Sequence, residues 1–96
     1  MKAVIVEDEL IAAQNLQRLI QQVDSDIEVI VVLQSVKESI EWFMFHPAPE
    51  LVFMDIHLAD GSSFSIFEKV EISCPIIFTT AYDEYALKAF EVNSID

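Results

Sequence analysis

The sequence predicts an α/β domain built on a doubly wound parallel sheet. Two observations lead there: short apolar runs alternate with segments of helical periodicity, and the runs are apolar throughout instead of alternating with polar residues. Strands of this kind are buried on both faces, which is typical of a parallel sheet between helices. Right-handed crossovers then let the first strand lie centrally, with the second strand on one side and the third on the other.

Four apolar runs are expected to form the strands. They are Lys2–Val6, Ile27–Leu33, Leu51–Met54 and Ile76–Thr79. Pro75 fits this assignment because proline is tolerated at the start of a strand. Ile95 could begin another strand just before the sequence stops.

Helices are expected between these strands. The first has one apolar face, made by Ala12, Leu16, Leu19, Ile20 and Val23. Ser35 and Glu38 form a capping box that opens the second, and "HPAP" ends it because proline cannot continue a helix. The residues of this second helix expected to point inward are Val36, Ile40, Phe43 and Met44.

The second half of the chain continues the pattern. "HLADGSS" is expected to be a loop, followed by a short third helix marked by Phe64, Phe67 and Val70 after a serine cap. Asp83 is expected to cap a fourth helix containing Leu87 and Phe90. We find no linker and no internal repeat beyond this rhythm, so residues 1–96 are expected to form one domain.

Composition excludes several functions. The 96 residues carry 17 acids against 5 Lys and Arg, a net charge of −12, which repels a nucleic acid backbone. No apolar run approaches the about 18 residues of a membrane helix, and no signal peptide is visible. The single cysteine, Cys74, cannot form an internal disulfide. We therefore expect a cytoplasmic protein without direct nucleic acid or membrane contact.

Acidic residues follow two of the predicted strands directly. Glu7 and Asp8 come after the first strand and Asp55 after the third. The carboxyl ends of neighbouring parallel strands meet at one edge of the sheet, about 4.8 Å apart. Carboxylates this close repel, so either one keeps its proton or a divalent cation neutralises them. Oxygen ligands with open positions suit Mg²⁺, and an exposed carboxylate beside Mg²⁺ suggests a phosphoryl acceptor.

Each of these residues also has an ordinary structural explanation. Asp55 could be a turn residue that ends a strand, and Glu7 and Asp8 could stabilise a helix N-terminus. Thr80, at the end of the fourth strand, could reflect β-propensity alone. Asp60 is assigned to turn chemistry, because it precedes the only glycine. The combination of acids after two strands and a hydroxyl after a third is more specific than any single residue.

Three stretches, "VIVEDE", "LVFMDIHLADG" and "PIIFTTAYDEYALKAFEVNSID", resemble a bacterial response-regulator receiver domain. The last is most similar to receivers of the LytR/AlgR type, which precede a LytTR DNA-binding domain. The resemblance implies a flavodoxin-like fold with strand order 2-1-3-4 and without the fifth strand and helix. It implies that Asp55 is the phosphoacceptor, which takes phosphate from a sensor histidine kinase. It also implies Mg²⁺ held by Glu7, Asp8, Asp55 and the backbone carbonyl of His57, with Thr80 as the switch hydroxyl.

The family pattern continues where this sequence stops. In the family, a fifth strand carries a switch aromatic and a lysine that pairs with the phosphoryl group, and a fifth helix follows. A receiver truncated before that strand is expected to keep its cation pocket. Its phosphorylation, and the signal that follows from it, are expected to be weak. It is also expected to form a homodimer through the exposed edge of the fourth strand. Among the aromatic residues, Tyr82 and Tyr85 are better candidates for a partner surface than Trp42 and the phenylalanines, which are assigned to packing.

Two other functions compete with this signalling switch, which is not expected to be an enzyme. A phosphatase of the haloacid-dehalogenase type also uses a strand-ending Asp with Mg²⁺. It needs a second Asp two residues later, where this chain has His57. A pseudo-receiver that only mediates protein contacts is the third interpretation.

Overall fold

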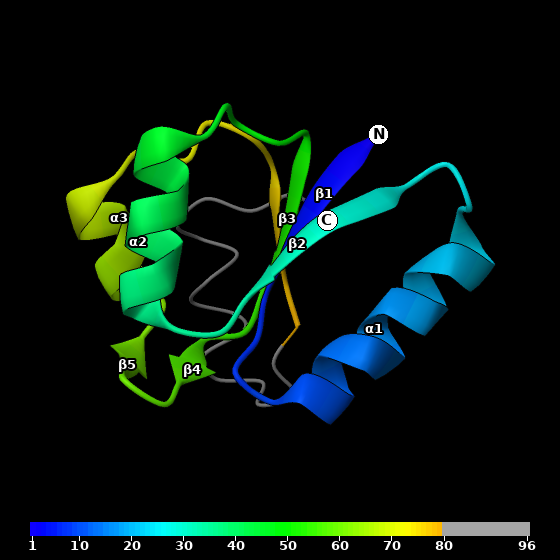
Figure 1. Cartoon of the computed structure of the whole chain (residues 1–96), viewed down its shortest axis with the longest axis horizontal. Helices are drawn as coiled ribbons and strands as arrows, with labels where there is room; N and C mark the ends of the chain where they lie inside the picture. Colours follow the sequence, from blue (N-terminus) through cyan, green and yellow to red (C-terminus); the bar gives the residue numbers. More distant parts are fainter. Residues whose placement is uncertain (80–96) are drawn as a thin grey trace.

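The computed structural model describes residues 1–79, which form a parallel sheet with helices on both faces (Figure 1). The strands of this sheet are β1 (Lys2–Val6), β2 (Glu28–Leu33), β3 (Leu51–Met54) and β6 (Ile76–Phe78). Their order is β2-β1-β3-β6, with every neighbouring pair parallel, so the predicted order 2-1-3-4 is confirmed. The predicted fourth helix and the strand at Ile95 lie outside the described residues.

The described helices are α1 (Leu10–Val23), α2 (Val36–Phe45) and α3 (Phe64–Lys69). Helix α1 lies on one side of the sheet, and α2 and α3 lie on the other (Figure 1). The side chains of β1 divide between these layers. Ala3 and Ile5 pack in the core on the α1 side, whereas Val4 and Val6 pack in the core with α2 and α3. Burial on both faces explains why the strand is apolar from Ala3 to Val6.

The N-terminus of α2 has the predicted cap. The Ser35 hydroxyl accepts a hydrogen bond from the Glu38 N–H at 2.9 Å. The Glu38 carboxylate reaches back to the N–H of Gln34 at 2.7 Å, one residue earlier than the capping-box pattern indicates. The helix ends at Phe45, two residues before Pro47, as expected.

One predicted inward position of α2 is wrong: Met44 is 60% exposed, and the buried residues of this helix are Val36 and Ser39. In α1, Ala13 and Ile20 are buried, while Leu19 and Val23 of the predicted apolar face are exposed and line a hollow beside the sheet. Periodicity indicates which residues share a face of a helix, but how deeply each is buried depends on where the helix meets the sheet.

The expected loop "HLADGSS" contains a two-stranded antiparallel hairpin, formed by β4 (His57–Leu58) and β5 (Gly61–Ser62). Ala59 and Asp60 form its two-residue turn, and Gly61 follows with φ +143°, a conformation that favours glycine. The expected serine cap of α3 takes another form. Ser63 occupies the N-cap position without a side-chain hydrogen bond, and the Ser62 hydroxyl accepts from the N–H of Phe64.

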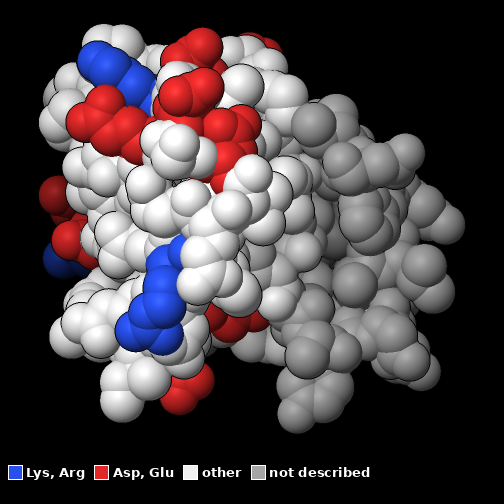
Figure 2. All heavy atoms as spheres, turned by 90° about the vertical axis from the view of Figure 1, so that its right-hand side faces the viewer, with Lys and Arg blue, Asp and Glu red and all other residues white. Residues whose placement is uncertain are grey.

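The surface on the α1 side reflects the charge imbalance. Asp and Glu side chains gather at one end of this face, while much of its middle is neither acidic nor basic (Figure 2). An apolar hollow of about 310 Å³ lies between α1 and the sheet; it is lined by Leu16, Leu19, Ile20, Val23, Ile27, Leu51, Phe53 and Ile77. In the part of the chain that the structure describes, no helix is long and apolar enough to cross a membrane.

Candidate functional site

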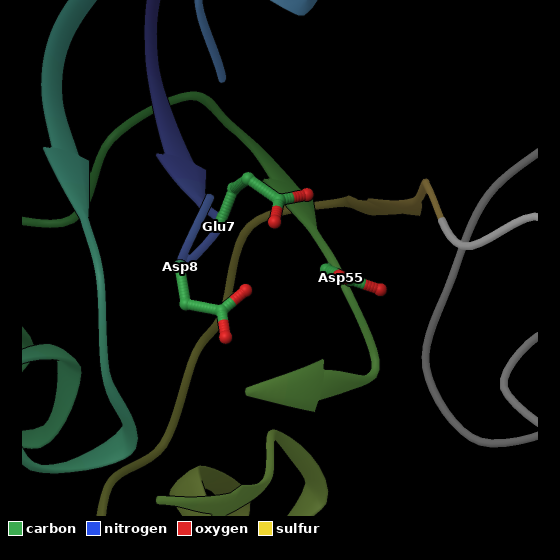
Figure 3. A group of neighbouring side chains, drawn as sticks. All are labelled: Glu7, Asp8 and Asp55. Atoms are coloured by element: carbon green, nitrogen blue, oxygen red, sulfur yellow. The ribbon is translucent and has the colours of Figure 1, made fainter. Parts of the chain in front are cut away.

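Glu7, Asp8 and Asp55 lie together at the carboxyl edge of the sheet (Figure 3). β1 and β3 are neighbours in register, with Val6 opposite Met54, so the residues that follow each strand also face each other. The N–H of Asp55 donates to the Val6 carbonyl oxygen at 2.9 Å, which extends the pairing by one residue. Each acid offers a carboxylate oxygen, and these oxygens all lie within 4.8 Å of one another.

The three carboxylates have different surroundings. Glu7 is only 8% exposed, and one of its carboxylate oxygens accepts a hydrogen bond from the Glu9 N–H at 3.1 Å. Burial is the main cause that raises its pKa from the usual 4.5 to about 7, and the negative charges of Asp55 and Asp8 add to the effect. Asp8 and Asp55 are half-buried. The site therefore combines one buried carboxyl whose pKa is raised with two half-buried carboxylates.

This donor set fits a hard divalent cation. Three carboxylates on a rigid edge, with one side open, match the way Mg²⁺ binds proteins through a few carboxylates while keeping waters and accepting phosphate oxygens. Bound Mg²⁺ would also offset the negative charges of Asp55 and Asp8, which add to the effect of burial in raising the pKa of Glu7.

The other predicted site residues lie near this edge or outside the described residues. His57 opens the hairpin two residues after Asp55, and its side chain is exposed. Thr79 follows β6, and its N–H donates to the Met54 carbonyl oxygen at 3.0 Å, which brings the chain to the same edge. The predicted switch residue Thr80 and the partner candidates Tyr82 and Tyr85 lie outside the described residues.

Asp60 has a contact that the turn assignment missed. It does occupy the hairpin turn, but its carboxylate also accepts hydrogen bonds from the N–H groups of Val36 and Lys37, at 2.8 and 3.1 Å. These bonds hold the pKa of Asp60 below its usual range. The partners are 24 and 23 residues away in sequence. No local sequence pattern signals a helix cap supplied from such a distance.

Fold and site together define a class of protein: a doubly wound α/β domain with a candidate divalent-cation site at the carboxyl ends of its central strands. The family model described as the response regulator receiver domain matches residues 3–96. The chain belongs to the response-regulator receiver domain family of two-component systems.

Relatives and solved structures agree with this membership. The chain is 36% identical to the sensory transduction protein LytT of Bacillus cereus and 40% identical to LytT of Enterococcus faecalis, over 100% of its own length. It spans only 39% and 40% of those proteins. The response regulatory domain of mrkE from Klebsiella pneumoniae superimposes with a TM-score of 0.81 at 29% identity, covering 100% of this chain and 80% of that one. The predicted flavodoxin-like receiver fold is thus confirmed.

Proposed function

We propose that this chain is a phosphoacceptor switch, in which Asp55 takes a phosphoryl group from the phosphohistidine of a sensor kinase. The observation that carries the proposal is the convergence of three carboxylates within 4.8 Å at the strand ends of a receiver domain. Asp55 is half-buried and follows a fully buried strand, so its carboxylate is both accessible and rigidly held. Glu7 is a weaker candidate for the nucleophile than Asp55, because the raised pKa of Glu7 leaves it partly protonated near neutral pH.

The residues have separate roles in this proposal. The Glu7, Asp8 and Asp55 carboxylates and the His57 backbone carbonyl would hold Mg²⁺, which supplies charge neutralisation for the incoming phosphoryl oxygens. A carboxylate oxygen of Asp55 forms a bond to phosphorus as the bond from phosphorus to the histidine nitrogen breaks, and the released imidazole takes up a proton. Thr80 would then donate its hydroxyl hydrogen bond to the phosphoryl group.

The partners follow from the family and the relatives. A sensor histidine kinase would supply the phosphoryl group, and a LytTR DNA-binding domain outside this chain would be the output. The chain spans about two fifths of the LytT proteins it matches, which leaves room for such a domain in relatives of that length. The net charge of −12 is consistent with DNA contact being made elsewhere.

The test is intact mass spectrometry after incubation with acetyl phosphate and Mg²⁺. We expect a single phosphoryl adduct on the chain, at low yield, with no adduct without Mg²⁺ and none on Asp55→Asn. Asp26→Asn, at an exposed acid remote in sequence from the site, is the control that should still be modified. Catalytic turnover of a phosphate ester would favour the phosphatase. No adduct on this chain or on a longer one would favour the pseudo-receiver.

A further inference from the structure

The β4–β5 hairpin is tied at both of its ends. At its base, the N–H of Ser63 donates to the carbonyl oxygen of Ile56 at 2.8 Å, and Ile56 is 1% exposed. At its tip, the Asp60 carboxylate bonds the N–H groups of Val36 and Lys37 at the start of α2. The hairpin therefore bridges the segment that follows Asp55 and a helix on the same side of the sheet (Figure 1).

The first turn of α2 does not depend on Asp60 alone for its hydrogen bonds. The Glu38 N–H donates to the Ser35 hydroxyl at 2.9 Å, and the Ser39 N–H donates to the Ser35 carbonyl oxygen at 3.0 Å. Asp60 takes the two N–H groups that remain at the helix start. The local cap and the cap from the hairpin can thus be removed separately, one by changing Ser35 and the other by changing Asp60.

His57 connects this hairpin with the candidate cation site. It is the first residue of β4, and it pairs with Ser62 across the hairpin. A backbone carbonyl binds a metal ion more tightly when the segment that carries it is held in place, and fixing the tip of a six-residue hairpin restricts its base as well. This tip is fixed by the Asp60 carboxylate, which accepts hydrogen bonds from the N–H groups of Val36 and Lys37 at the start of α2.

We propose that Asp60 is a positioning residue that holds the β4–β5 hairpin against α2, so that the His57 carbonyl is preset for Mg²⁺ and occupancy of the site is transmitted to the first turn of α2. This inference rests on the proposed function, because it assumes that the acid cluster binds Mg²⁺. Coupling of this kind is reciprocal. If the hydrogen bonds between Asp60 and α2 strengthen cation binding, cation binding strengthens these hydrogen bonds to the same degree.

The experiment compares the Mg²⁺ affinity of the wild-type chain with that of two variants by calorimetric titration with Mg²⁺ alone. Asp60→Ala removes both hydrogen bonds from the hairpin and is expected to weaken affinity about tenfold, the lower end of what loss of an outer-shell partner costs. Ser35→Ala is the matched control, since it removes a hydrogen bond from the same helix end without touching the hairpin. Asp60→Asn keeps one acceptor oxygen and is expected to fall between wild type and Asp60→Ala.

Amide hydrogen exchange measured by NMR with and without Mg²⁺ gives a second measurement. A purely structural cap would protect the Val36 and Lys37 amides to the same degree in both conditions. In the wild-type chain and in Ser35→Ala, Mg²⁺ is expected to slow exchange of the Val36 and Lys37 amides. In Asp60→Ala it is expected to leave them unchanged. Circular dichroism identifies any variant that has lost its fold. If Asp60→Ala is such a variant, Asp60→Asn takes its place in the comparison with wild type and Ser35→Ala.

The outcomes separate this inference from the function beneath it. If the wild-type chain binds Mg²⁺ but Asp60→Ala and Ser35→Ala weaken binding equally, or neither does, the positioning role is wrong and the cation site stands. Exchange at Val36 and Lys37 that ignores Mg²⁺ in the wild-type chain overturns the coupling. If the wild-type chain binds no Mg²⁺, both the cation site and the positioning role fall.

Discussion

Replacing Glu7 by glutamine is expected to stabilise the ion-free protein at neutral pH. The Glu7 side chain is buried beside Asp8 and Asp55, and burial is the main reason that its pKa rises from 4.5 to about 7. Glutamine has the same shape and no charge, and its carbonyl oxygen can still accept the hydrogen bond from the Glu9 N–H. The substitution therefore removes the cost of an ionised carboxyl in this position and little else.

The magnitude follows from the pKa. Each tenfold change in proton affinity is worth about 1.4 kcal/mol, so the shift from 4.5 to about 7 corresponds to about 3 kcal/mol. Because the folded-state pKa lies above the unfolded-state value, the stabilising contribution of protonated Glu7 is fully present below pH 4.5. It is lost as the pH rises and is gone above about pH 7.

The assay is urea unfolding of wild type and Glu7→Gln from about pH 5 to about pH 8, with and without Mg²⁺. The two proteins should differ by less than about 1 kcal/mol in free energy of unfolding at the acidic end, and the variant should be more stable by up to about 3 kcal/mol at the basic end. Added Mg²⁺ should stabilise wild type at the basic end, since it binds the ionised site, and should stabilise the variant much less. Glu9→Gln, at an exposed neighbouring acid, is the control for loss of one negative charge.

The comparison between proteins removes the effect of the other acids, which titrate in both. A difference between wild type and Glu7→Gln that does not change with pH would refute the assignment of the raised pKa to Glu7. The same pH dependence in Glu9→Gln and Glu7→Gln would show that overall acidity, and not burial in the cluster, is responsible.

Three further predictions concern the fold and its association. Gly61→Ala should cost about 1–3 kcal/mol through its backbone alone, because φ is +143° and nothing lies within 4 Å of an added methyl group; an unchanged urea midpoint would contradict this. Ile5→Ala, at a residue with 0% exposure, should cost about 2–5 kcal/mol by thermal unfolding. Ile30→Ala, at 39% exposure, should cost clearly less. The homodimer through the β6 edge stays a prediction: β6 is the last strand of the described sheet, and light scattering that finds only monomer at high concentration would exclude it.

The sequence by itself determined the layered fold and three members of the candidate site. Runs such as Leu51–Met54, apolar on both faces, leave a parallel sheet between helices as the way to bury them. Once the strand order is set by right-handed crossovers, the acids after β1 and β3 must meet, because a strand displays its following residue at its carboxyl end. Glu7, Asp8 and Asp55 were predictable for this reason.

Only the tertiary structure decided how deeply each apolar helix residue is buried and how the hairpin attaches. Met44 and Val23 fit an apolar period, yet both are exposed, because burial depends on where a helix meets the sheet as well as on its periodicity. Asp60 lies 24 residues from Val36, and their hydrogen bond exists because two loops come together at one end of the sheet. A local pattern can predict the turn at Asp60, but a contact between segments distant in sequence is set by how the layers pack.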